Sequence, residues 1–156
     1  MFTSWPPWRH PSIRKFDLKT GQSELVTGSE DFENPQWSPD GKFIAASSTK
    51  NSKLMLLDLA KRSWFELADG RPDASGIRWS PDSKYVYYQY ANDAEEQPIF
   101  RVRVSDRHAE QITSARKIPS ADVLTYSLTG LTPDGSPVVS FEHRNSDVYA
   151  LELEMR

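Results

Sequence analysis

The chain has 156 residues, a formal net charge of −3 at pH 7 and no cysteine. The missing thiols exclude a disulfide scaffold, a cysteine-based zinc site and a cysteine nucleophile. The mildly acidic balance argues against electrostatic binding to nucleic acid or to an anionic membrane surface. No apolar run approaches the roughly 20 residues that a membrane span needs.

Residues 1–12 form an N-terminal arm that precedes the repeated part of the sequence. Trp5, Trp8 and the pair Pro6-Pro7 in this arm have no counterpart later in the chain. We interpret the arm as a docking segment or as a disordered remnant of an upstream repeat. It lacks the apolar core of a secretory signal peptide, and the compartment stays open between cytoplasm and periplasm.

From residue 13 onward the sequence repeats itself. The run Trp37-Ser-Pro-Asp-Gly-Lys-Phe-Ile44 returns as Trp79-Ser-Pro-Asp-Ser-Lys-Tyr-Val86 and, more loosely, as Leu131-Thr-Pro-Asp-Gly-Ser-Pro-Val138. A second apolar run alternates with the first, and its copies are Ile13–Leu18, Leu54–Leu59, Ile99–Val104 and Val148–Leu153. The spacing is close to the 40–45 residues of a propeller blade.

Each repeat predicts four short strands. The Ser-Pro-Asp-Gly run is typical of a type I turn, in which proline presets φ at the second position. A β-prone run follows the turn; the best example alternates Val86 and Tyr88 on one face with Tyr87 on the other. The second apolar run, a polar hairpin and a fourth strand complete the unit, which is typical of a β-propeller blade.

The sequence therefore predicts an all-β fold with a partial β-propeller over residues 13–156. The strands amount to about three four-stranded antiparallel blades, with blade pieces at residues 13–28, 34–68, 76–113 and 127–154. The first piece is expected to supply two strands and the last piece three. Because propellers close with about four to eight blades, we expect either part of a larger ring or a homodimer in which two chains complete one propeller.

The Trp-Ser-Pro-Asp-Gly-Lys-x-Ile-Ala unit at residues 37–45 resembles the repeat of TolB-type, WD40-like bacterial propellers. More narrowly, the order of Ile13–Thr20, Trp37–Gly41, Lys53–Asp58 and Ile99–Val104 resembles the C-terminal propeller end of bacterial regulators with a winged-helix or kinase domain upstream. The chain contains neither of those domains. Only the propeller part of the resemblance therefore carries over to this chain, and the regulatory activity does not.

The sequence gives little support for catalysis. No Gly-x-Ser-x-Gly nucleophile elbow is present. His10, His108 and His143 lack the spacing of a metal site, and Asp40, Asp82 and Asp134 are explained by the turns. We expect no enzymatic activity, no cofactor and no metal.

Trp37 and Trp79 occupy equivalent repeat positions, which favours packing between neighbouring blades over an exposed stacking platform for sugars or bases. Binding in propellers usually takes place where the loops of successive blades converge on the axis. The candidate binding residues on those loops and on the first strands of the blades are Gln36, Arg71, Asp73, Arg78, Arg116, Lys117 and Tyr126. An alternative interpretation is that the long segment around Arg116 and Lys117 only covers a sheet edge.

The favoured function is a non-enzymatic propeller module that binds a protein or another ligand, as the sensor or scaffold part of a bacterial regulator. One alternative is the accessory propeller of a prolyl-oligopeptidase-like hydrolase, and another is a carbohydrate- or metal-binding propeller. The expected partners are a protein and a second copy of the chain, without nucleic acid binding by this segment or a membrane span.

Overall fold

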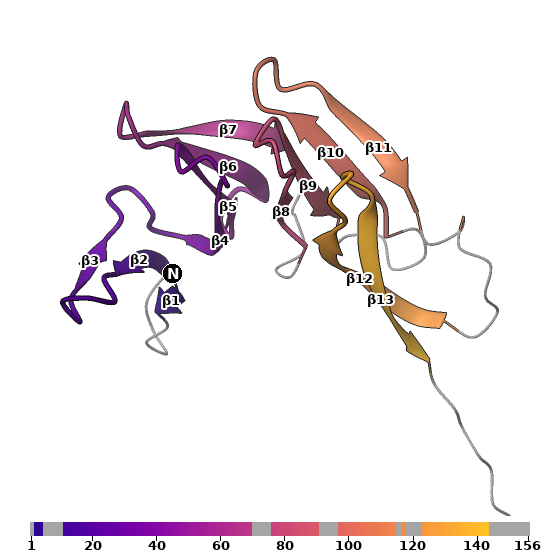
Figure 1. Cartoon of the computed structure of the whole chain (residues 1–156), viewed down its shortest axis with the longest axis horizontal. Coiled ribbons are helices and arrows are strands. Elements are labelled where there is room, and N and C mark those ends of the chain that lie inside the picture. The colour runs from indigo at the N-terminus through magenta and orange to yellow at the C-terminus, as the bar shows by residue number, and fades with distance from the viewer. Residues whose placement is uncertain are drawn as a thin grey trace, which may run out of the picture.

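A computed structural model of the chain describes residues 2–4, 11–69, 76–90, 97–114, 117 and 123–143. These residues form four antiparallel sheets that follow one another along an arc (Figure 1). The strands are β1 (Phe2–Ser4), β2 (Ser12–Phe16), β3 (Ser23–Leu25), β4 (Phe32–Trp37), β5 (Phe43–Ser48), β6 (Lys53–Asp58), β7 (Ser63–Asp69), β8 (Arg78–Trp79), β9 (Tyr85–Gln89), β10 (Ile99–Arg103), β11 (Ala109–Thr113), β12 (Val123–Leu131) and β13 (Pro137–His143). Within these residues no helix is long and apolar enough to cross a membrane.

The two central sheets are complete four-stranded blades. Their strands are hydrogen-bonded in sequence order, β4-β5-β6-β7 and β8-β9-β10-β11, and this confirms the predicted all-β propeller class. The first sheet has three strands, because β1 pairs with β2 where the repeat pattern predicts only two strands. The last sheet contains β12 and β13, and the expected strand at residues 148–153 lies outside the described part of the chain.

The predicted turns form at all three Pro-Asp positions. Gly41, Ser83 and Gly135 occupy the fourth position, and each donates its N–H to the carbonyl oxygen three residues earlier at 2.9–3.0 Å. All three have positive φ, which Ser83 adopts at 60° without the freedom of glycine. The Ser83 hydroxyl compensates by accepting the Asp40 N–H of the preceding blade at 3.0 Å.

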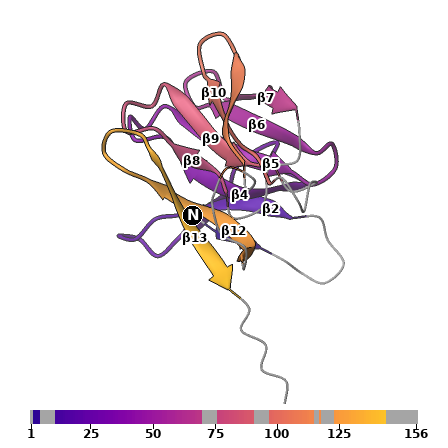
Figure 2. The same cartoon turned by 90° about the vertical axis from the view of Figure 1, so that its right-hand side faces the viewer.

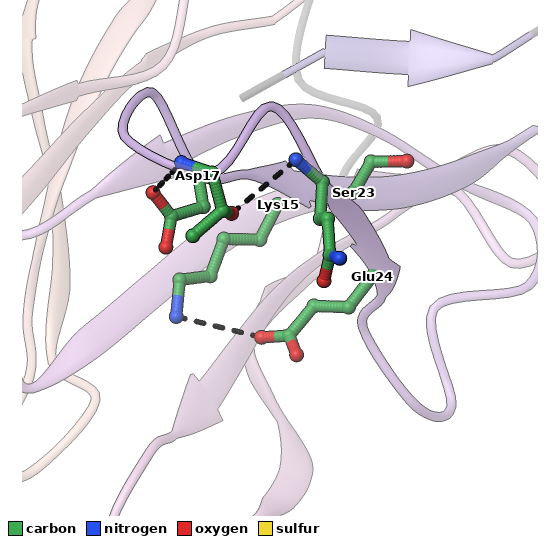
Figure 3. A pocket seen from close by; sticks show the side chains of 6 residues that line it. Lys15, Asp17, Ser23 and Glu24 are labelled. Atoms are coloured by element: carbon green, nitrogen blue, oxygen red, sulfur yellow. Dashed lines mark hydrogen bonds and ion pairs between the residues drawn. The ribbon is translucent and has the colours of Figure 1, made fainter.

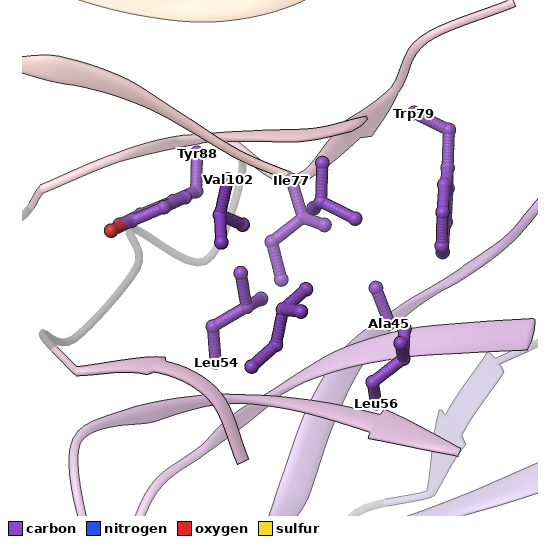
Figure 4. Close-up of a cluster of buried hydrophobic side chains, with 9 residues drawn as sticks. Ala45, Leu54, Leu56, Ile77, Trp79, Tyr88 and Val102 are labelled. Atoms are coloured by element: carbon purple, nitrogen blue, oxygen red, sulfur yellow. The ribbon is translucent and has the colours of Figure 1, made fainter. Parts of the chain in front are cut away.

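The main hydrophobic core lies between the two complete blades (Figure 4). Leu54 and Leu56 of β6 face Val86 and Tyr88 of β9 across this interface, with Trp79 of β8 at one end. Full burial of each aliphatic side chain contributes roughly 1.5–3 kcal/mol. Packing between sheets, more than hydrogen bonding within them, therefore fixes how neighbouring blades stack.

A second core joins the blade β8–β11 to the sheet of β12 and β13. It contains Tyr87, Ile99, Tyr126 and Leu128, all buried. Tyr87 thus points away from Val86 and Tyr88, as the sequence alternation predicts. In the view from the end of the arc, the sheet of β12 and β13 lies in front of that blade (Figure 2).

Candidate functional site

The first strands of successive sheets meet along one edge of the arc, which we call the axial edge. β8 contacts both β4 and β12 there, although long stretches of sequence separate the three strands. The three strands therefore lie next to one another, as sequence reasoning expects for the first strands of propeller blades. Gln36 lies on β4, Arg78 on β8 and Tyr126 on β12.

Arg78 is the most unusual group at the axial edge. Its Nε donates to the carbonyl oxygen of Thr129 on β12 at 2.9 Å, and its Nη1 donates to the carbonyl oxygen of Ile77 at 2.7 Å. No carboxylate in the described part of the chain forms an ion pair with it. Partial burial lowers the pKa of the guanidinium, but arginine stays charged at any ordinary pH.

Gln36 takes part in the axial edge through its backbone. Its carbonyl oxygen accepts the indole N–H of Trp79 at 2.9 Å, a bond that ties β4 to β8. The Trp79 ring also stacks on Phe43 of the preceding blade, with ring centroids 6.4 Å apart. The prediction that Trp79 packs between blades is confirmed, whereas Trp37 at the equivalent position is 39% exposed.

Tyr126 is buried and does not line the axial edge with its side chain. Its ring stacks on Phe141 of β13, and its hydroxyl donates to the carbonyl oxygen of Gln97. Burial raises the pKa of Tyr126 to about 12. The geometry is that of a packing residue between two sheets.

The structure does not place any of the remaining predicted binding residues at the axial edge. Lys117 is exposed, and its N–H donates to the Ser114 carbonyl oxygen at 3.0 Å. Arg71, Asp73 and Arg116 lie outside the described residues. Thr129 and Ile77, whose carbonyl oxygens hold Arg78, were not singled out by sequence reasoning, because a backbone acceptor leaves no signal in the residue type.

A small polar hollow of about 150 Å³ lies over the hairpin between β2 and β3 (Figure 3). Asp17 accepts the N–H groups of Lys19 and Thr20 at 2.8 and 3.2 Å, and these bonds lower its pKa. Turn formation accounts for these polar groups. We therefore assign these polar groups to the turn and not to a binding site.

Clusters of metal-ligating residues are not found among the described side chains. These side chains contain no group of three or more histidine, aspartate or glutamate residues placed to hold a metal ion. His108 is exposed at the turn between β10 and β11, and its backbone N–H donates to the carboxylate of Asp106 at 3.1 Å.

Solved structures similar to the chain are β-propellers. TolB from Acinetobacter baumannii matches with a TM-score of 0.61 and 20% identity, over 86% of this chain and 37% of TolB. The putative TolB of Agrobacterium tumefaciens matches with a TM-score of 0.64 and 23% identity, over 95% of this chain and 51% of that protein. The propeller domain of the trilobed protease from Pyrococcus furiosus matches with a TM-score of 0.55 and 20% identity, over 73% of this chain and 38% of that domain.

The chain spans about half the length of these structures or less. No protein-family model and no curated protein matches the sequence. At these identities the likeness concerns the fold. The chain is an arc of consecutive β-propeller blades with the fold of TolB-type propellers.

Proposed function

We propose that the chain is a non-enzymatic β-propeller module that binds a protein partner at its axial edge, as the sensor or scaffold part of a regulator. The observation that carries this proposal is Arg78. A guanidinium that is partly buried, held by two carbonyl oxygens and without a carboxylate partner among the described residues is ready to accept an anion. Arginine is the residue type best suited to bind a carboxylate through two parallel hydrogen bonds.

The preferred ligand is an acidic side chain or a C-terminal carboxylate of a partner protein. A rigid position for the guanidinium lowers the entropy cost of binding. The two carbonyl bonds of Arg78 fix it between β8 and β12, so a partner would find it already oriented.

The test is a titration with a short oligo-aspartate peptide, compared with an oligo-lysine peptide of the same length. Arg78→Lys keeps the charge but loses the planar fork, and we expect it to weaken binding of the acidic peptide about tenfold. Arg14→Lys is the matched control, because the Arg14 guanidinium also bonds a carbonyl oxygen, that of Ser23, but lies on β2 in the first sheet. Equal affinity of the wild type and the Arg78 variant for the acidic peptide would refute the proposal.

We also propose that a second copy of the chain covers the ends of the arc and completes a ring. Large apolar side chains are exposed on the two end sheets, including Phe16 on β2, Leu25 on β3 and Val138 on β13. Burial of such side chains against another sheet is the usual solution in propellers. Light scattering is expected to give a dimer that Phe16→Ser with Leu25→Ser weakens, and a monomer with a cooperative thermal transition would contradict this.

A further inference from the structure

The interface between the first sheet and the blade β4–β7 departs from the interface one repeat later. In the later interface, the cross-strand pair Leu56 and Phe65 faces the pair Trp79 and Val86. One repeat earlier, the corresponding pairs are Lys15 with Glu24, and Trp37 with Ile44. At this earlier interface the blade β4–β7 thus presents an apolar pair, as the next blade does, whereas the first sheet presents an ion pair.

This exchange leaves a cleft of about 390 Å³ between the two sheets. The blade β4–β7 lines this cleft with the apolar residues Trp37, Ile44, Leu57 and Leu59, and Val26 adds an apolar side chain from the first sheet. Lys15 and Glu24 line the cleft from the first sheet. They form an ion pair with 3.4 Å between Nζ and Oε1, which Figure 3 shows. The volume lies within the range of small-molecule sites.

Trp37 has a different environment from Trp79, although the repeat makes them equivalent. Trp79 is 9% exposed and its indole N–H has an acceptor, whereas Trp37 is 39% exposed and its N–H has none among the described residues. An accessible indole face with a free N–H can stack on a planar ligand and donate to it. Trp37 therefore supplies both an apolar surface and a polar handle.

Arg62 gives the cleft its charge. It lies in the turn between β6 and β7 with φ at 54°, and Arg107 occupies the same turn of the next blade with φ at 60°. The Arg107 guanidinium lies 5.0 Å from the Phe65 ring of the preceding blade. In the first sheet, Glu24 occupies the repeat position of Phe65 and lines the cleft together with Arg62. Glu24 is paired with Lys15, and no described carboxylate forms an ion pair with Arg62, so the cleft carries one surplus positive charge.

We infer that this cleft is a binding site for a small planar apolar molecule that carries one carboxylate. The ring would stack on Trp37 above the apolar residues of the cleft, and the carboxylate would pair with Arg62. This site does not include Arg78, because no residue of β8 lines it, although Trp37 lies on β4, which also forms part of the axial edge.

The experiment uses 2-naphthoate as the probe and the uncharged 2-naphthamide as its comparison. Binding is followed by the indole N–H signal of Trp37 in the NMR spectrum, assigned with Trp37→Phe. We expect naphthoate to shift this signal in a saturable way and to bind about tenfold more tightly than naphthamide, as for one charged hydrogen bond. Arg62→Gln should abolish that preference, whereas Arg107→Gln, the matched turn arginine, should keep it.

A second variant fills the cleft with the residues of the later interface. Lys15→Leu with Glu24→Phe should raise the melting temperature, shield Trp37 from acrylamide quenching and remove naphthoate binding. Equal binding of both probes, or an unmoved Trp37 signal, overturns the inference. Arg78→Lys should leave naphthoate binding intact, so that failure at one site is distinguishable from failure at the other.

Discussion

The indole N–H of Trp79 donates to the backbone carbonyl oxygen of Gln36 at 2.9 Å, and this bond links the inner strands of two successive blades. It joins residues that lie one repeat apart in the sequence. Because Trp79 is also buried in the main core, one side chain combines a directional bond with apolar packing across the interface.

Trp79→Phe removes the hydrogen bond and leaves a smaller ring in the core. We expect the free energy of unfolding to fall by about 2 kcal/mol. Trp37→Phe, at the equivalent and exposed position, should change it by less than about 0.5 kcal/mol. Urea unfolding followed by circular dichroism measures both, and equal losses would contradict the assigned difference in packing.

Gln89 is the polar counterpart of this link at the next interface. Its amide donates to the Tyr126 carbonyl oxygen at 2.7 Å and accepts the Leu128 N–H at 2.9 Å, and the side chain is 2% exposed. Gln89→Leu would leave two buried backbone groups unpaired and should lower the free energy of unfolding by about 2–4 kcal/mol. Ser47→Ala is the control at the equivalent position, because the buried Ser47 hydroxyl has no partner among the described residues. If chemical denaturation showed only a small decrease in the free energy of unfolding for Gln89→Leu, the two Gln89 hydrogen bonds would not be what holds the two sheets together.

Gly76 is required by a close approach between two segments of the same blade, the segment before β8 and the strand β9. A Cβ at this position would lie 2.9 Å from the Cβ of Gln89 and 3.1 Å from its backbone nitrogen. Gly76→Ala should therefore destabilise the fold by about 1–3 kcal/mol. At Gly130 the nearest atom would be the Val138 Cβ at 4.0 Å, so Gly130→Ala is expected to be tolerated. Thermal melts of both variants test the contrast, which would vanish if the backbone near Gln89 could shift freely.

The three turn aspartates predict how stability depends on pH. A hydroxyl at the first turn position donates to each carboxylate, from Ser38 to Asp40 at 2.7 Å, from Ser80 to Asp82 at 2.7 Å and from Thr132 to Asp134. These bonds, followed by backbone N–H donors, lower the pKa of all three carboxyls. A lowered folded-state pKa contributes stability that is present above the unfolded value near 4 and is lost as the pH falls through the folded values.

We therefore expect the urea midpoint to be nearly flat above about pH 5 and to fall below pH 4. Replacement of Asp40, Asp82 and Asp134 by asparagine should make this acid decline shallower, because the amide oxygen still accepts the turn bonds but does not titrate. An unchanged acid decline in the triple variant would place its origin elsewhere.

Much of the fold could be predicted because it depends on local chemistry. Proline and aspartate specify the turns, and the alternation around Val86 and Tyr87 specifies which face of β9 points to which neighbour. The pairing of β1 with β2 could not be predicted, because β1 has no counterpart in the later repeats. Tyr126 was expected at a binding surface and is buried, since its environment depends on Phe141 and Gln97 rather than on its neighbours in sequence.

The sequence by itself determined the all-β class, the blade repeat and the turn chemistry, since each depends on residues a few positions apart. Only the tertiary structure decided what lies between the blades. Trp79 and Trp37 occupy equivalent positions but differ in exposure. Leu56 and Phe65 face Trp79, whereas Lys15 and Glu24 face Trp37. The environment of a side chain at an interface is set by both sheets, and a repeat pattern read along one chain specifies only one of them at a time.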